Sequence, residues 1–224
     1  MKRSEINHAL KRMQKMIDEQ KISLPPFCNW TPKEWEDKGS EYDEIRDNML
    51  GWDITDFGLG DFKQKGFSLI TLRNGNVSND KYKKPYAEKL LYLEEGQTAE
   101  MHYHKYKMED IINRGGGNVI ITVYNSTKDG IFDNTDVTVY SDGRRFVVKA
   151  GTKVTLKPGE SITVTRGLYH DFAVESGHGP VLLGEVSMTN DDTTDNYFYN
   201  PKVGRFPQIE EDEEPYRLLC NEYH

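Results

Sequence analysis

The N-terminal part of the chain carries hydrophobic residues at helical spacing. In residues 4–20 apolar side chains recur every three or four positions, which predicts one amphipathic helix packed on the rest of the domain. Ser4 is its expected N-cap, and the prolines of LPPF end it. A second, short helix is predicted at TPKEW, whose threonine and glutamate form a capping box around the proline. Between residues 41 and 61 we expect a short helix followed by irregular structure.

From Phe67 onward the pattern changes to short runs rich in Val, Ile, Thr, Tyr and Leu, separated by turn residues and continuing to about Ser187. This pattern is typical of an antiparallel sandwich or barrel, so the fold class is mainly β. We predict one structural domain: an N-terminal helical extension (1–65) packed outside a β-barrel (66–200), then a C-terminal strap (201–224). The predicted strands lie in FSLITLRNG, AEKLLYLEEGQ, NVIITVYNS, DVTVYSDG, TKVTLKPGE, SITVTRG, HDFAVESG and PVLLGEV.

Composition narrows the classes of partner. The formal net charge of −8 argues against a nucleic-acid or anionic-membrane partner, because either would require a basic surface. No apolar run approaches the roughly 20 residues that a membrane span requires. The N-terminus is charged from Lys2 onward and lacks a secretory apolar block, and the two cysteines, Cys28 and Cys220, suit free thiols in a reducing compartment. We therefore expect a cytoplasmic protein with neither kind of partner.

The segment MHYHKYKMED raises the question of a metal site. Residues two apart on a strand project to the same face with Cα atoms about 6.6 Å apart, so His102 and His104 can converge on one ion. Glu109 follows and can supply a carboxylate oxygen. A single His-x-His pair is weak evidence, since histidine pairs are common on protein surfaces. A later histidine in a strand-turn-strand context strengthens it.

The chain resembles the cupin superfamily at both of that family's motifs. The segment GESITVTRGLYHDFAV is similar to the second cupin motif and contributes His170, although Thr165 replaces its proline and Val174 its asparagine. Neither replaced residue is a metal ligand in that family, so the resemblance implies an intact metal site in a cupin jelly-roll barrel. The first motif is matched at every spacing, by Gly96, His102, His104, Glu109 and Gly116.

A more specific resemblance covers most of the chain. The segments YAEKLLYLEEGQ, EDIINRGGGN, GLYHDF, GEVS, DNYF and EDEEPYRLLCNEY are similar to D-lyxose isomerases of the cupin type. This resemblance implies an aldose–ketose isomerase that interconverts D-lyxose and D-xylulose, often with D-mannose and D-fructose as a second pair. It also implies a divalent metal ion, usually Mn²⁺, a small-molecule sugar substrate and a homodimer.

The candidate site residues follow from this chemistry. Three imidazoles and a carboxylate leave room on an octahedral ion for two oxygens of an open-chain sugar. The isomerisation also needs a base, and Glu185 is the candidate because an inward-facing acid in the apolar run PVLLGEVS is costly without a role. Lys107 is expected near the metal, to stabilise charge or relay a hydroxyl proton. The predicted metal ligands are His102, His104, Glu109 and His170, and the predicted sugar-binding residues are Phe172, Asp191 and Arg205.

Two other functions use the same fold. A cupin dioxygenase would place Fe²⁺ on the same ligands and consume oxygen. A non-catalytic cupin would bind a sugar as a regulator's sensor domain, although this sequence shows neither a helix-turn-helix nor a basic patch. Because the cupin fold alone does not choose among these functions, the resemblance along the whole chain favours the isomerase.

Overall fold

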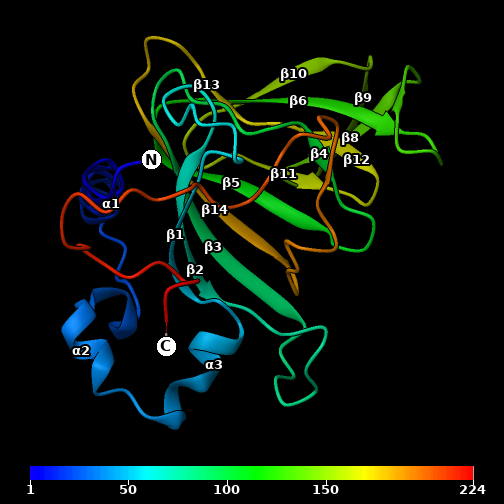
Figure 1. Ribbon diagram of the computed structural model, residues 1–224. Coiled ribbons are helices and arrows are strands. Elements are labelled where there is room, and N and C mark those ends of the chain that lie inside the picture. Colours follow the sequence, from blue (N-terminus) through cyan, green and yellow to red (C-terminus); the bar gives the residue numbers. More distant parts are fainter. Residues whose placement is uncertain (224) are drawn as a thin grey trace.

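The computed structural model describes residues 1–223 and consists of two curled antiparallel sheets that face each other (Figure 1). Within the described residues, the first sheet has eight strands in the order β1-β2-β3-β14-β5-β11-β8-β9, and the second has the order β10-β6-β12-β4-β15 with β7 and β13 beside β6. The strands are β1 (Gly51–Thr55), β2 (Phe67–Arg73), β3 (Tyr86–Leu93), β4 (His102–Tyr103), β5 (Glu109–Gly116), β6 (Val119–Ser126), β7 (Phe132–Asp133), β8 (Val137–Ser141), β9 (Arg144–Val148), β10 (Thr152–Leu156), β11 (Ser161–Val164), β12 (Leu168–His170), β13 (Ala173–Val174), β14 (Val181–Met188) and β15 (Tyr197–Phe198).

The space between the sheets holds the main hydrophobic core. On β5 and β6, buried and partly exposed positions alternate along each strand, as expected where one face packs on a core and the other meets solvent. Ile111, Ile121, Val123 and Val164 are fully buried between the sheets. The prediction of a mainly β fold is confirmed.

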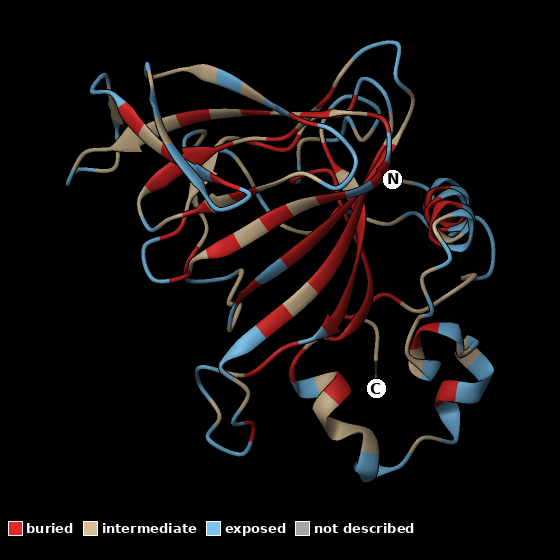
Figure 2. Cartoon of the chain, turned by 180° about the vertical axis from the view of Figure 1, so that it is seen from behind, coloured by how far each residue is buried: buried red, intermediate tan, exposed pale blue. Residues whose placement is uncertain are grey.

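Helix α1 (Arg3–Glu19) covers the outer face of the eight-stranded sheet (Figure 1). Its apolar stripe, including Leu10 and Met13, packs on Ile70, Leu90 and Leu182 of the sheet in a second core. Strands β1 to β3 are therefore covered on both faces and are buried along most of their length (Figure 2). The predicted packing of N-terminal helices outside the barrel is confirmed. No helix within residues 1–223 is long and apolar enough to cross a membrane.

The start of α1 differs from the prediction, because Lys2 and not Ser4 is the N-cap. The C-terminal segment supplies the acceptors that the first turn lacks: the amide of Arg3 donates to the carbonyl of Glu210 at 2.9 Å. The amide and hydroxyl of Ser4 donate to the carboxylate of Asp212 at 2.9 and 2.8 Å. The acidic run of the tail is thus bonded to the helix N-terminus, where negative charge is favourable.

The segment after the second helix contains a strand that the sequence pattern did not predict. The two predicted short helices are present, α2 (Pro32–Glu36) with its capping box and α3 (Asp43–Asp47). Two 3₁₀ helices that were not predicted accompany them, η1 (Pro26–Asn29) and η2 (Ser40–Tyr42). Residues 51–55, however, form β1, which pairs with β2 from Gly51↔Thr71 to Thr55↔Phe67. Trp52 and Ile54 pack in the core beneath α1, whereas Asp53 and Thr55 line a cavity inside the barrel. The inner face of β1 is therefore polar because its residues form part of the polar lining of this cavity.

Candidate metal centre and active site

Three histidine rings meet on the inner face of the smaller sheet. His102 on β4 is the direct pairing partner of His170 on β12, and their ring centroids are 4.2 Å apart. His104 follows β4, two residues after His102, with its ring 5.0 Å from that of His102. One ligand nitrogen from each ring lies within 4.8 Å of the other two, a spacing that permits a shared metal ion. The predicted convergence of these histidines is confirmed.

The backbone fixes the orientation of each ring. In all three, Nδ1 lies at hydrogen-bond distance from a main-chain carbonyl, which only accepts, so Nδ1 carries the proton. The Nε2 lone pair then points to the common centre, the arrangement seen where a histidine binds metal. Burial and the neighbouring rings hold the pKa of His102 well below its usual value, so this ring is neutral. The acceptors are the carbonyls of Glu100 for His102 at 2.8 Å, of Asp195 for His104 at 2.8 Å and of Leu168 for His170 at 3.1 Å.

Glu109, the first residue of β5, completes the donor set. Its Oε1 lies 3.3 Å from Nε2 of His104 and 3.1 Å from Nε2 of His170. Both Nε2 atoms are buried and have no hydrogen-bond partner. Burial opposes ionisation of Glu109, but the ammonium group of Lys107 outweighs it and the pKa of Glu109 lies well below the usual range. The lone pairs of these nitrogens and the carboxylate of Glu109 therefore face one another in a buried space. A divalent cation bound between them would offset their mutual repulsion.

Lys107 lies beside the metal centre with its side chain buried. Its Nζ contacts Oε2 of Glu109 at 2.7 Å, Oε1 of Glu185 at 3.1 Å and Oδ1 of Asn190 at 2.8 Å. Burial would lower the pKa of Lys107, but Glu109 and Glu185 outweigh that effect and raise it above its ordinary value. Lys107 is therefore a protonated donor, and the predicted approach of this loop lysine to the metal site is observed.

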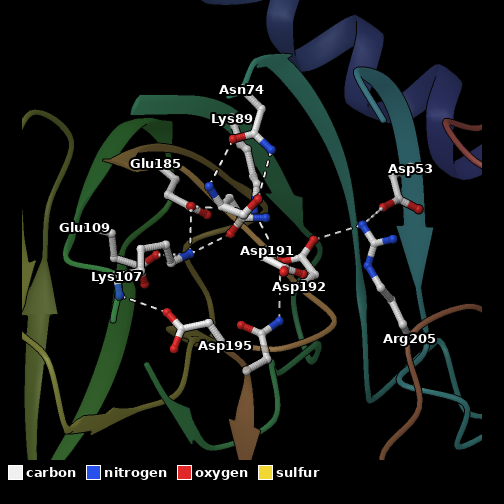
Figure 3. A network of polar contacts seen from close by, with 12 residues as sticks. Asp53, Asn74, Lys89, Lys107, Glu109, Glu185, Asp191, Asp192, Asp195 and Arg205 are labelled. Carbon is white, nitrogen blue, oxygen red and sulfur yellow. Dashed lines mark hydrogen bonds and ion pairs between the residues drawn. The ribbon is translucent and has the colours of Figure 1, made fainter. Parts of the chain in front are cut away.

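Glu185 projects into the barrel from β14. It is 5% exposed and pairs in register with Lys89 of β3 and Ile111 of β5. The Nζ of Lys89 lies 3.5 Å from Oε1 of Glu185, so two ammonium groups balance this carboxylate. Figure 3 shows Glu185, Lys107 and Glu109 directed toward one another. The inward orientation expected from the apolar strand is observed, and the carboxylate has charged partners.

A second group of charges lies on the side of this polar network away from Glu109 (Figure 3). Nη2 of Arg205 contacts Oδ2 of Asp53 at 3.0 Å and Oδ2 of Asp192 at 2.8 Å. Lys89 lies 3.6 Å from Asp192 and so connects this group to Glu185. Burial raises the pKa of Asp53 to about 6 although Arg205 opposes the shift. Burial also opposes ionisation of Asp192, but Lys89 and Arg205 prevail and its pKa is lowered.

One cavity of about 330 Å³ connects the metal centre to these charges. Its walls combine aromatic rings with convergent polar groups, the usual character of a small-molecule site. Phe172, predicted as a wall, lines it and lies with its ring centroid 5.5 Å from that of His170. The aromatic wall consists of Phe57, Phe67, Phe172 and Phe198, and the polar lining includes Asp53, Thr55, Lys89, His102, His104, Lys107, Glu109, Glu185, Asp192, Asn196 and Arg205.

Asp191 is the one predicted sugar-binding residue that does not line this cavity. Its carboxylate accepts hydrogen bonds from the amide and hydroxyl of Thr193 at 3.0 and 2.6 Å and from the hydroxyl of Thr194 at 2.7 Å. These bonds turn it into its own loop, where it lines a neighbouring cavity of about 210 Å³. Asp192 takes the position that we expected for Asp191. The other predicted residue of this pair, Arg205, lines the main cavity.

Three charged residues of the site were not predicted. Lys89 lies in the apolar run AEKLLYL, and the argument that selected Glu185, a charge on a buried strand, applies to it equally. Asp53 lies between Trp52 and Ile54 in a segment that we read as irregular. Asp192 is adjacent to the predicted Asp191, and sequence gives no means of choosing between two consecutive aspartates in a loop.

Comparison with known proteins places this geometry in context. A family model described as D-lyxose isomerase matches residues 1–223. A D-lyxose/D-mannose isomerase from Serratia proteamaculans is 47% identical over 100% of this chain and 98% of its own length, and one from Escherichia coli is 44% identical with the same coverage. The solved L-ribose isomerase of Cellulomonas parahominis has a TM-score of 0.64 at 14% identity, covering 94% of this chain and 98% of that one. That likeness and the two facing sheets confirm the predicted cupin barrel.

Proposed function

The chain belongs to the D-lyxose isomerase family and is an aldose–ketose isomerase, and from this premise we propose that it interconverts D-lyxose and D-xylulose, with D-mannose and D-fructose as a slower second pair. The names of the relatives support these sugars. The observation that carries the proposal is a single cavity that contains a buried histidine centre at one end and a group of charged hydrogen-bonding residues at the other.

The metal ligands in this proposal are His102, His104, Glu109 and His170. Three imidazole nitrogens and one carboxylate oxygen suit a first-row divalent cation, and we propose Mn²⁺ because the isomerisation involves no net redox change. Two unpartnered Nε2 atoms beside a buried carboxylate support a resident cation at this position. When bound, such an ion supplies Lewis acidity to the oxygens on C1 and C2 of an open-chain sugar.

Glu185 is the proposed proton carrier. Four carboxylates line the cavity, but Glu109 faces the histidines, and Asp53 and Asp192 are both paired with Arg205. Glu185 remains, next to the metal centre. In the forward direction its carboxylate removes the proton from C2 and returns it to C1, while the hydroxyl proton of O2 passes to O1. Atoms and charge then balance without any external reagent.

Lys107 is the proposed partner of that step. Because its pKa is raised, it remains an ammonium group and donates hydrogen bonds. Its Nζ lies between Glu109 and Glu185, at 2.7 and 3.1 Å, so it is placed to stabilise negative charge that develops on the sugar oxygens beside Glu185. Buried donors of this kind act strongly, since the surrounding space excludes water.

The far end of the cavity is the proposed site of sugar selection. Lewis acidity and proton transfer act on any aldose, so discrimination must come from residues that contact the distal hydroxyl groups. Arg205 and Asp192 offer a charged donor and a charged acceptor there, and Phe172 contributes an apolar wall beside the histidines. Sites that hydrogen-bond a hydroxyl reject sugars that lack it in the correct position.

The test is a product assay with metal control. Chelator-treated protein is incubated with a panel of pentoses and hexoses before and after addition of Mn²⁺, and products are identified by chromatography. We expect D-xylulose from D-lyxose after reloading. Oxygen consumption with Fe²⁺ and no ketose product would favour the dioxygenase, and sugar binding without turnover would favour a sensor. We also propose a homodimer, which light scattering tests.

A further inference from the structure

Asp195 lies in the segment between β14 and β15 and makes contacts with two parts of the proposed active site. Its side chain is buried, with 5% of the residue exposed. The segment also contains Asn190, which accepts from Lys107 Nζ, and Asp192, which pairs with Arg205. Asp192 lines the cavity but Asp195 does not, so the role of Asp195 must come from the residues that it holds in place.

The carboxylate of Asp195 accepts three consecutive backbone amides. Oδ1 accepts from Lys105 at 2.8 Å and from Tyr106 at 3.0 Å, and Oδ2 accepts from Lys107 at 2.8 Å. Consecutive amides that converge on one anion form a nest, in which the negative charge compensates several backbone dipoles at once. Charge-assisted bonds of this type are stronger than neutral ones. The loop between His104 and Glu109 is thus folded around one carboxylate.

The main-chain carbonyl of the same residue accepts from Nδ1 of His104 at 2.8 Å. That bond fixes the tautomer of His104 and aims its Nε2 at the metal centre. Asp195 therefore holds a metal ligand through its backbone and, through its side chain, the backbone amide of Lys107. The two held residues are three positions apart in sequence, and the two residues between them, Lys105 and Tyr106, are exposed.

We propose that Asp195 is a positioning residue that fixes His104 and Lys107 relative to each other, so that metal binding and proton transfer depend on the same brace. The part of this proposal that concerns Lys107 in catalysis rests on the proposed function, whereas the part that concerns metal binding by His104 does not. The brace explains why a buried carboxylate in this loop is bonded only to backbone amides. Replacement by asparagine turns one accepting oxygen into a donor that faces amide hydrogens, and the nest opens.

The test uses Asp195→Asn, with Asp195→Ser as the second variant in case the first does not fold. Both retain the carbonyl that His104 needs. Asp142→Asn is the matched control, because Asp142 also accepts a backbone amide, from Ser161 at 3.0 Å, in a turn outside the cavity lining. Amide hydrogen exchange of residues 105–107, the dissociation constant for Mn²⁺ and kcat at saturating Mn²⁺ are measured for each protein.

We expect faster exchange confined to residues 105–107, Mn²⁺ binding weakened by about 10–100-fold, and a lower kcat that added Mn²⁺ does not restore. The control should match the wild type in all three. Unchanged Mn²⁺ affinity and kcat despite faster exchange would overturn the proposal, as would an equal loss in Asp142→Asn. If the wild type isomerises no sugar, the proposed function fails, whereas exchange and Mn²⁺ affinity still decide whether Asp195 braces His104.

Discussion

The ammonium group of Lys107 lies 3.1 Å from Oε1 of Glu185, and both residues are at most 5% exposed. Such a pair is costly to bury unless each charge has further partners. Lys107 also contacts Glu109, and Glu185 also lies near Lys89, so charges of opposite sign alternate from the metal centre into the sheet. This alternation places the proposed base, Glu185, next to the proposed donor, Lys107, in the lining of the cavity.

The first prediction concerns Glu185→Gln, which preserves size but removes the base. Turnover should fall by about 10²–10⁴-fold, the usual contribution of general-base catalysis. Mn²⁺ affinity should remain near the wild-type value, because Glu185 is not among the metal ligands. Steady-state kinetics with D-lyxose and a Mn²⁺ titration measure both quantities. A variant that turns over at the wild-type rate would remove Glu185 from the mechanism.

The second prediction concerns Lys107→Met, which leaves Glu109 and Glu185 without their shared cation. Removing one partner from a buried ion pair typically costs roughly 3–5 kcal/mol, so the free energy of unfolding of the metal-free protein should fall by about that amount. Turnover should fall as well. Urea denaturation measures the first effect. Lys149→Met is the control, since Lys149 pairs with Asp136 on the exposed surface and should change stability by less than about 1 kcal/mol.

The third prediction concerns the metal ligands. Chelation should abolish isomerase activity, and Mn²⁺ or another divalent ion should restore it. His102→Ala, His104→Ala and His170→Ala should each lose the metal while the barrel stays folded, as followed by metal analysis and circular dichroism. His178→Ala is the matched control, because its side chain is half exposed and outside the cavity lining. Full activity in a metal-free preparation would contradict the assignment.

Sequence selected the residues that meet at the candidate metal centre because their signal is local. His102 and His104 are two apart on one strand, and the spacing to Glu109 and the later His170 matches known motifs. Glu185 was found for a different reason, namely that a charge within an apolar strand is costly without a partner. Each of these inferences needs only the residue and its immediate neighbours.

The remaining site residues depend on contacts between distant segments. Lys89 and Glu185 meet because β3 pairs with β14, and no local pattern gives that register. Asp53 was missed because residues 51–55 were read as irregular structure, although Trp52 and Ile54 alternate with the cavity-lining Asp53 and Thr55 along this strand. Ser4 was assigned as a helix cap by local rules, but Asp212, 208 positions later, bonds to it instead. Tertiary contacts override local preference at each of these positions.

The fourth prediction concerns pH. Burial raises the pKa of Asp53 from 3.8 to about 6, so between pH 4 and 6 the folded chain holds a proton that the unfolded chain has released. The contribution of Asp53 to the free energy of unfolding should therefore fall as pH rises through that window, by on the order of 3 kcal/mol in total. The measurement is the free energy of unfolding of the wild type minus that of Asp53→Asn, which cannot titrate at this position, at each pH in the window. A difference that rises with pH would contradict the buried environment assigned to Asp53.

The last prediction concerns sugar selection by Arg205. D-Lyxose should be converted faster than D-xylose, which differs only at C2, where Glu185 acts on one face of the carbon. D-Mannose shares the configuration of D-lyxose at C2 to C4 and adds a group at the far end, where Arg205 and Asp192 lie. Arg205→Met removes the charged donor and leaves Asp53 without its ion-pair partner, whereas Asp192 keeps Lys89. Since a hydrogen bond to a charged group contributes about 1.5–3 kcal/mol, KM for D-lyxose should rise by roughly 10–150-fold while Mn²⁺ affinity is unchanged. Arg12→Met is the control and should leave KM unaltered, because Arg12 pairs with Glu94 on the surface and lies outside the cavity lining. A loss confined to kcat, with KM at the wild-type value, would place Arg205 away from the sugar.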